Sequence, residues 1–258
     1  MAVNRITSLN NPQVRQWAKL LSAKGRMQQG LFLAEGEHMA GEALREGAAD
    51  RLLIDEARIE RYQAFIQSGL PVTLLPSAVL LKLCDAKTPQ GILAICALSR
   101  LPQATLTACG RAVALNAVQD PGNVGTILRT IDAAGFDTLI VDSKTADPLN
   151  PKAMRASMGA VFRAPVIQTS DLAGALKRLS DHDIIAGHLE GDDFYSQTFF
   201  DQPPCLLIGN EGAGIDPALL PFVTRKVRLP MPGKAESLNA GVAAAIMMYE
   251  FVRRDIQK

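Results

Sequence analysis

Hydrophobic and polar positions alternate with two different periods along the first hundred residues. Short apolar runs bounded by Gly, Pro or Asp are typical of buried strands, and apolar positions three or four apart are typical of helices. The pattern predicts helices over residues 12–24, 36–46, 57–67 and 76–83, and strands over residues 31–34, 52–54, 72–75 and 91–97. This alternation predicts a small α/β domain over residues 1–100.

A similar alternation resumes after residues 98–110, a weakly patterned stretch where we place the domain boundary. Beyond it the pattern predicts strands over residues 112–118, 138–141, 166–168, 183–187, 205–208 and 226–229, and helices over residues 122–134, 152–158, 172–179 and 238–253, with a helical turn at 217–220. Strands that alternate with helices favour a mostly parallel sheet covered on both faces. The second predicted domain, residues 110–258, is therefore also α/β.

Charge changes this picture in one place. The 258 residues hold 27 basic and 26 acidic side chains, so the net charge of +1 does not support a polycation that coats nucleic acid by charge alone. The first 34 residues, however, contain Arg5, Arg15, Lys19, Lys24 and Arg26 and no acidic residue. Such a run forms either a solvated helix face or an edge that contacts phosphates.

The cysteines and the apolar runs bear on metal and membrane sites. Cys84, Cys96, Cys109 and Cys205 form no C-x-x-C pair, and the histidines are not spaced near them like zinc ligands. We expect no metal site, and scattered cysteines fit a reducing cytoplasm. No apolar run reaches the 18 residues or more that would predict a membrane-spanning helix.

Three loops that follow predicted strands have unusual compositions. In open parallel sheets, ligands bind beyond the carboxyl ends of the strands, so these loops are candidates for a binding site. In the first loop, Asp120 to Asn123 are turn and cap residues that lead into a helix, and Arg129 projects from that otherwise apolar helix. A helix cap and a surface arginine would explain this segment when it is taken alone.

The second loop has glycines at Gly209, Gly212 and Gly214, with Glu211 among them. Glycine lets backbone amides approach a ligand closely. The order G-x-x-G-x-G reverses the dinucleotide-binding order G-x-G-x-x-G, and no Walker sequence occurs in the chain. A tight turn with a solvated glutamate remains open for this segment.

The third loop, residues 229–239, is stiffened by two prolines. Ser237 fits a helix cap, but a cap at that position does not explain the polar Asn239. The helix that follows is apolar nearly all round, which predicts burial in a core or in a subunit interface.

Together the three loops resemble the SpoU/TrmH family of SPOUT methyltransferases. The family pattern is N-x-G-x-x-x-R after D-P, then G-N-E-G, then L-P-M-x-G-x-x-x-S-L-N before a terminal helix. This chain reads D-P-G-N-V-G at 120–125 with Arg129, G-N-E-G at 209–212 and L-P-M-P-G-K-A-E-S-L-N at 229–239. The first half, with I-T-S-L-N-N-P at 6–12, more loosely resembles the ribosomal-protein-like substrate-binding domain of such enzymes.

The resemblance implies a trefoil-knotted catalytic domain, a homodimer, and methylation of a ribose 2′-hydroxyl in structured RNA with S-adenosylmethionine as cofactor. Ribosomal RNA is favoured over transfer RNA, because the first domain looks like a ribosomal protein. The implied cofactor-binding residues are Gly187, Ile208, Gly209, Asn210, Glu211, Gly212, Leu229, Met231 and Leu238. The implied catalytic residues are Arg129, Asn123, Glu211, Ser237 and Asn239, and the implied RNA-binding residues are Arg5, Arg15, Lys19, Lys24 and Arg26.

The role of Arg129 stays open between a base that activates the hydroxyl and a cation that stabilises the developing alkoxide. A guanidinium has a pKa far above the physiological range and is seldom a base, which favours the cation. We expect Glu211 and Asn239 to order the loops, Asn123 to contact RNA or Arg129, and Ser237 to contact the acceptor nucleotide.

The sequence also bears on two other function classes. A non-catalytic RNA-binding module of the same fold would lack S-adenosylmethionine binding, and the presence of Arg129, Glu211, Ser237 and Asn239 argues against it. A nucleotide-dependent dehydrogenase is disfavoured by the reversed glycine order.

Overall fold

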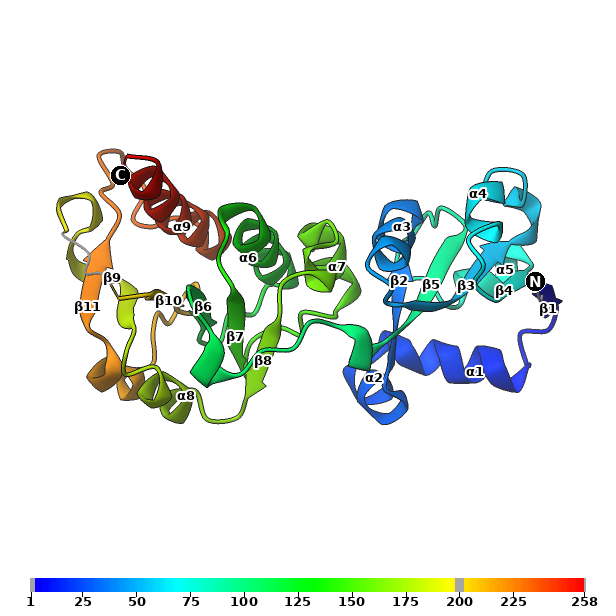
Figure 1. Cartoon of the computed structure of the whole chain (residues 1–258), viewed down its shortest axis with the longest axis horizontal. Helices are drawn as coiled ribbons and strands as arrows, with labels where there is room; N and C mark the ends of the chain where they lie inside the picture. Colours follow the sequence, from blue (N-terminus) through cyan, green and yellow to red (C-terminus); the bar gives the residue numbers. More distant parts are fainter. Residues whose placement is uncertain (1–2, 198–201, 258) are drawn as a thin grey trace. The chain divides into compact units, whose positions relative to one another are not determined.

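The computed structural model describes residues 3–197 and 202–257. Contacts between residues divide the chain into a first unit, Met1–Leu101 with Leu149–Arg163, and a second unit, Pro102–Pro148 with Ala164–Lys258. Figure 1 traces the elements of both units along the chain. Residues 149–163 fall in the predicted domain 110–258, but they pack within the first unit.

The first unit is built on a five-stranded sheet with the order β1-β4-β3-β5-β2, in which β5 runs antiparallel to both of its neighbours. Its strands are β1 (Val3–Arg5), β2 (Leu31–Glu35), β3 (Ala49–Asp55), β4 (Val72–Leu75) and β5 (Ile92–Ala97). Its helices are α1 (Pro12–Ala18), α2 (Ala23–Gln29), α3 (Glu37–Arg45), α4 (Gln63–Ile66), α5 (Ser77–Leu81) and α7 (Pro151–Ser157). The sequence pattern missed β1, because its three side chains are all exposed and show no alternation.

The prediction of a single helix over residues 12–24 is wrong, because the chain bends between α1 and α2. After α1 come a 3-10 turn at Lys19–Leu21 and an extended residue, Ser22, with φ −98° and ψ 145°. The Ser22 hydroxyl accepts a hydrogen bond from the Gly25 amide at 3.1 Å and begins α2. A Cβ at Gly25 would lie 1.9 Å from the Lys19 carbonyl oxygen, so the bend requires glycine there.

Each face of the first sheet has its own apolar layer. On one face Leu33, Leu53 and Leu93 pack with α1 and α5. On the other face Phe32 stacks on Phe162, with ring centroids 6.0 Å apart. Phe162 belongs to the returning segment 149–163, so a residue far along the chain covers a strand near its start.

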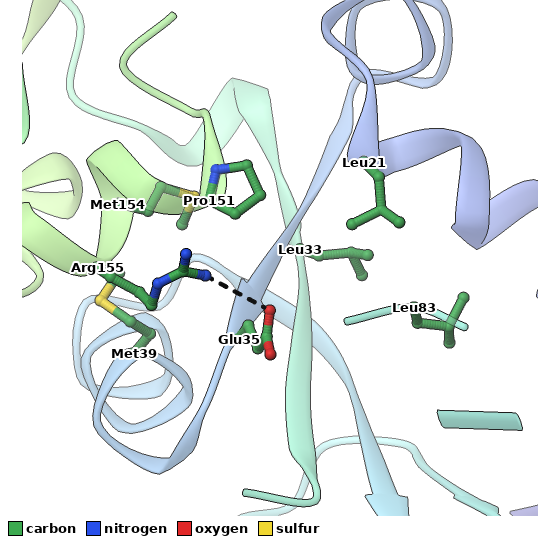
Figure 2. Close-up of a pocket in the computed structure, with 8 residues that line it drawn as sticks. All are labelled: Leu21, Leu33, Glu35, Met39, Leu83, Pro151, Met154 and Arg155. Carbon is green, nitrogen blue, oxygen red and sulfur yellow. Dashed lines mark ion pairs between the residues drawn. The ribbon is translucent and has the colours of Figure 1, made fainter. Parts of the chain in front are cut away.

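Figure 2 shows how α7 lies against β2. Met154 is buried, and the cavity left between α7 and the sheet holds about 10 Å³, about enough for one water. The Arg155 guanidinium lies 3.8 Å from the Glu35 carboxylate (Figure 2) and 2.7 Å from Asp85. Glu42 of α3 pairs with Arg163, the last residue of the segment. Apolar packing and ion pairs therefore both hold residues 149–163 in the first unit.

The second unit is built on a six-stranded sheet with the order β11-β9-β10-β6-β7-β8, and every neighbouring pair is parallel. Its strands are β6 (Ala112–Leu115), β7 (Thr138–Asp142), β8 (Val166–Thr169), β9 (Asp183–Asp193), β10 (Pro204–Ile208) and β11 (Arg225–Arg228). Its helices are α6 (Pro121–Ala134), α8 (Leu172–Arg178) and α9 (Ala240–Ile256).

Helices cover both faces of this sheet, as predicted. Leu172 and Leu176 of α8, with Leu219 of the 3-10 turn Pro217–Phe222, pack on one face. The helices α6 and α9 pack on each other and on the opposite face (Figure 1). The α/β fold predicted for both halves is confirmed, whereas the trefoil knot implied by the resemblance stays a prediction.

We predict that Phe162→Ala destabilises the first unit specifically. Truncation of a buried phenylalanine costs about 3–5 kcal/mol, and Phe162 is 4% exposed. Amide hydrogen exchange should accelerate in β2 and α3, which the segment covers.

Phe136→Ala is the matched control. Phe136 is equally buried but contacts Phe251 in the second unit, with ring centroids 6.1 Å apart. It should accelerate exchange in α9 and leave β2 unchanged. Unaltered exchange in β2 of Phe162→Ala would contradict the assignment of residues 149–163 to the first unit.

Candidate functional site

The order of strands in the second sheet brings the three motif loops to one edge. β10 lies between β6 and β9, and β11 lies beside β9. Because all six strands are parallel, their carboxyl ends meet at the same edge. The loops that follow β6, β10 and β11 therefore meet there, although about 90 residues of sequence separate the first loop from the second.

A cavity of about 340 Å³ opens at this edge. That volume lies within the range of small-molecule sites. All nine residues predicted to bind the cofactor line it, namely Gly187, Ile208, Gly209, Asn210, Glu211, Gly212, Leu229, Met231 and Leu238. Ser237 also lines the cavity, whereas Asn123, Arg129 and Asn239 are absent from its wall.

The glycine loop is closed by a tight backbone pair. Asn210 and Gly214 exchange hydrogen bonds, with N–O distances of 2.9 and 3.0 Å. A Cβ at Gly209 would lie 2.4 Å from the backbone of Gly214, so no side chain fits there. The Asn210 side-chain oxygen accepts hydrogen bonds from the amides of Gly212 and Ala213, both at 2.9 Å. The loop is thus held by its own asparagine in the shape that lines the cavity.

Asn123 joins this loop to the helix α6. It is 7% exposed, and its side-chain nitrogen donates to the Glu211 carboxylate at 2.7 Å. We expected Asn123 to contact RNA or Arg129, but its amide is directed to Glu211 instead. The bond connects the first and second motifs and agrees with the predicted role of Glu211 in ordering the loops.

Arg129 lies on α6 but faces away from the core. It is exposed, six residues after the buried Asn123, as expected for positions about a third of a turn apart around a helix. Within residues 3–197 and 202–257, no carboxylate forms an ion pair with it. Arg129 therefore presents a positive charge to solvent.

The cap of the last helix is Asn239 and not Ser237. The Asn239 side-chain oxygen accepts hydrogen bonds from the amides of Gly241 and Val242, at 3.0 and 3.2 Å. Ser237 lies two residues before the cap and is exposed on the cavity wall. Ser237 is therefore available to a ligand. Asn239, which a cap at Ser237 did not explain, is itself the N-cap of α9.

Sequence reasoning missed half of the cavity wall. The additional lining residues are His188, Leu189, Gly214, Val227, Arg228, Glu236, Ala240, Ala243 and Met247. Glu236 lies inside the third motif and could have been included by position. His188 and Leu189 could not, because the strand predicted over residues 183–187 continues to Asp193 as β9.

The predicted RNA-binding residues differ in exposure and in hydrogen-bond and ion-pair partners. Lys19 and Lys24 are exposed, and Arg15 donates a weak hydrogen bond to Asn10 at 3.3 Å. Arg5 pairs with Glu56 at 2.6 Å. Arg26 contradicts the prediction: it is 4% exposed and donates to the carbonyl oxygens of Leu20 and Leu21, where it stabilises the bend before α2.

The described part of the chain, residues 3–197 and 202–257, bears on metal and membrane sites. No group of three or more His, Cys, Asp or Glu side chains there could hold a metal ion. No helix there is long and apolar enough to span a membrane.

Comparison with known proteins matches both halves of the chain to families. Residues 110–249 match the SpoU rRNA Methylase family, and residues 11–94 match the MRM3-like substrate binding domain. A Bacillus subtilis protein, the 23S rRNA (guanosine(2553)-2′-O)-methyltransferase RlmP, is 35% identical over 251 residues, which cover 96% of this chain and 98% of that one.

Solved structures are similar over nearly the whole length. An AdoMet-bound rRNA methyltransferase from Sinorhizobium meliloti has a TM-score of 0.82 and 32% identity and covers 98% of each chain. The SpoU methyltransferase AviRb from Streptomyces viridochromogenes, solved with AdoMet, has a TM-score of 0.82 and 29% identity, over 96% of this chain and 99% of that one. With motifs, fold and full-length similarity in agreement, the chain belongs to the SpoU rRNA methylase family.

Proposed function

We propose that this protein transfers a methyl group from S-adenosylmethionine to the 2′-hydroxyl of a ribose in ribosomal RNA. The observation that carries the proposal is the cavity whose wall combines the glycine loop with the loop at 229–239. Its relative in Bacillus subtilis, similar over nearly the full length, is a 23S rRNA 2′-O-methyltransferase.

The residues of the cavity fit this cofactor. Ile208, Leu229 and Leu238 offer apolar surface for the adenine base, and backbone groups of the glycine loop offer hydrogen bonds. The carboxylates of Glu211 and Glu236 line the same cavity and complement a ligand that carries positive charge on its sulfonium and amino groups.

S-adenosylmethionine, when bound, supplies an electrophilic methyl group on sulfur. The transfer would form a carbon–oxygen bond, break the carbon–sulfur bond with S-adenosylhomocysteine as the leaving group, and release the hydroxyl proton to solvent water. The task of the chain is to hold the acceptor ribose in line and to stabilise the negative charge that develops on its oxygen. The second sheet edge provides the fixed frame for this alignment.

Arg129 is the residue that we assign to the developing charge. It acts as a cation that orients the neighbouring phosphate and stabilises the alkoxide. Its exposure and the absence of an ion pair with any described carboxylate leave it available to RNA.

The other motif residues support the site around it. Glu211 and Asn123 hold the glycine loop on α6 through their 2.7 Å hydrogen bond. Asn239 fixes the start of α9, and the exposed Ser237 on the cavity wall contacts the acceptor nucleotide.

The first unit selects the RNA. Residues 11–94 match a substrate-binding domain, and Lys19 and Lys24 are exposed with no ion pair to any residue that the structure describes. Arg15 and Arg5 add to this surface, but the ion pair of Arg5 with Glu56 offsets part of its charge. Transfer RNA is the second candidate substrate. Either RNA would be modified in the cytoplasm.

We also propose that the protein acts as a homodimer through α9. Val242, Tyr249 and Ile256 recur every seven residues along the helix and are 45%, 50% and 80% exposed, which is typical of a helix that pairs with another. Beside this stripe, Arg253 and Arg254 both pair with the buried Glu250, and their hydrogen bonds lower the pKa of Glu250 to about 2.

The test of the proposed function uses methyl-labelled S-adenosylmethionine with RNA from cells that lack the protein. We expect label in a large ribosomal RNA and, after digestion, on a ribose 2′-oxygen. Label in transfer RNA instead would overturn the choice of substrate. Binding of RNA without binding of S-adenosylmethionine would favour the non-catalytic module.

Arg129→Ala should lower kcat in this assay by about 10²–10³-fold, the usual effect of removing one group that stabilises charge in the transition state. The dissociation constant for S-adenosylmethionine should stay unchanged, because Arg129 does not line the cavity. Arg129→Lys should keep part of the activity if charge is what matters. Near-normal turnover of Arg129→Ala would contradict its assigned role.

Replacing Lys19 and Lys24 together by Ala should weaken RNA binding and reduce the slope of log affinity against log salt by about 1 for each lysine. Filter binding at several salt concentrations measures this. Lys177→Ala, an exposed lysine on α8 of the second unit, is the matched control. An unaltered salt slope in the double variant would exclude this surface from RNA contact.

Tyr249→Lys should shift the protein from dimer to monomer, because it sets a charge in the apolar stripe. Sedimentation equilibrium gives the mass directly. Lys177→Glu is the control: it changes a charge on α8, and the variant should have the same mass in solution as the wild-type protein. A dimer that survives Tyr249→Lys and Val242→Lys together would show that α9 is not the interface.

A further inference from the structure

The carboxylate of Asp142, at the end of β7, accepts hydrogen bonds on both of its oxygens. One of its oxygens accepts from the backbone amides of Lys144 and Thr145 and from the Thr145 hydroxyl, at 3.1, 2.8 and 2.7 Å. The other accepts from the side-chain nitrogen of Asn116 at 2.9 Å, and both lie 3.1 Å from the amide of Ala117. Burial alone would raise the pKa of Asp142, but the bonds from Thr145, Asn116 and Ala117 outweigh it and lower the pKa.

The backbone that Asp142 holds is strained. Ala117 has φ +56°, in the left-handed region that a residue with a Cβ seldom occupies. Such strain persists when surrounding contacts fix it, and it is concentrated at functional sites. The carboxylate of Asp142 binds the Ala117 amide directly and is thus one of those contacts.

The two residues that Asp142 holds anchor both ends of the glycine loop. The Ala117 carbonyl oxygen accepts a hydrogen bond from the Asn210 side chain at 2.8 Å. The Asn116 side-chain oxygen accepts one from the amide of Asp216, also at 2.8 Å. Residues 210 and 216 bracket the loop that contains Glu211, Gly212 and Gly214, which line the cavity.

The chain of contacts continues to the helix that carries Arg129. Glu211, inside the anchored loop, accepts the hydrogen bond from Asn123 in the first turn of α6. Asp142 itself does not line the cavity. A single carboxylate outside the cavity is therefore connected to its wall and to α6 through hydrogen bonds and the loop backbone between them.

We propose that Asp142 is a positioning residue for the methyl-transfer site, which sets the glycine loop for cofactor binding by fixing Asn116 and Ala117. This inference rests on the proposed function. The prediction for Asp142→Asn is specific, because its new amide nitrogen would face the Asn116 side-chain nitrogen, donor against donor. The glycine loop would then lose its two anchors, although no group that lines the cavity is changed.

The test measures S-adenosylmethionine binding by calorimetry and the Tm of the ligand-free protein, side by side. We expect Asp142→Asn to weaken binding about tenfold or more, which corresponds to 1.4 kcal/mol at 25 °C. The measurement is made well below the Tm of each variant, so that the loss reports the folded state. A variant with lowered Tm and wild-type affinity would show a structural role only and overturn the proposal.

A polarity swap keeps the proposal testable if the single change also harms folding. In Asn116→Asp with Asp142→Asn, the new carboxylate at 116 accepts from the new amide at 142. Its second oxygen still accepts from the amide of Asp216. Affinity should return to within about threefold of the wild type, a difference of about 0.7 kcal/mol. If the double variant binds no better than Asp142→Asn, Asp142 does not act through Asn116.

A second rescue addresses Ala117. Glycine occupies the left-handed region without strain, so Ala117→Gly should recover part of the affinity lost in Asp142→Asn. If affinity does not recover, Asp142 does not act by fixing the conformation of Ala117, and that part of the proposal is wrong.

Asp171→Asn is the matched control. Asp171 is an exposed carboxylate that caps α8 by accepting from the Gly174 amide at 2.8 Å, and it has no part in the loops. Its substitution should leave S-adenosylmethionine affinity unchanged. If the wild type itself does not bind S-adenosylmethionine, the proposed function fails and this inference falls with it. If the wild type and Asp142→Asn bind S-adenosylmethionine equally well, the proposed function stands and only the inference about Asp142 is wrong.

Discussion

The parallel pairing of β10 between β6 and β9 is the constraint on which the rest of the second unit depends. All five residues of β10 are buried, and its backbone hydrogen bonds fix the register of the strands on either side. This register decides that the segment after Leu115 meets the segment after Ile208. The cavity, the hydrogen bond between Asn123 and Glu211 and the anchors of the glycine loop all follow from that meeting.

Four asparagines give this edge its rigidity. Asn116, Asn123, Asn210 and Asn239 each use a side-chain amide to join or cap elements. An amide both donates and accepts, so one side chain can bridge two backbone segments that each offer only one kind of group. Much of the polar chemistry at the edge therefore holds the loops in place, whereas the side chains of Arg129 and Ser237 are exposed.

The sequence predicted the secondary-structure elements and the motifs better than it predicted side-chain contacts. Apolar periodicity located the strands of both sheets except β1, and the resemblance to the SpoU/TrmH family implied nine residues of the cavity wall. It failed where hydrogen bonds between a side chain and backbone groups decide the outcome. Arg26 looks like its neighbours Lys19 and Lys24 in sequence, but the bend at Ser22 buries it. Asp142 carries no motif at all, because its importance lies in which backbone groups surround it.

The return of residues 149–163 to the first unit has a consequence for how such a protein can evolve. The chain passes from one unit to the other at three places, after Leu101, after Pro148 and after Arg163. A recognition domain attached by one linker can be exchanged between enzymes by a single recombination event. Here a transplanted front half would arrive without Phe162 and Met154, and its sheet would expose an apolar face. Exchange of the first unit would therefore require matched changes in residues 149–163 as well, and not one recombination event.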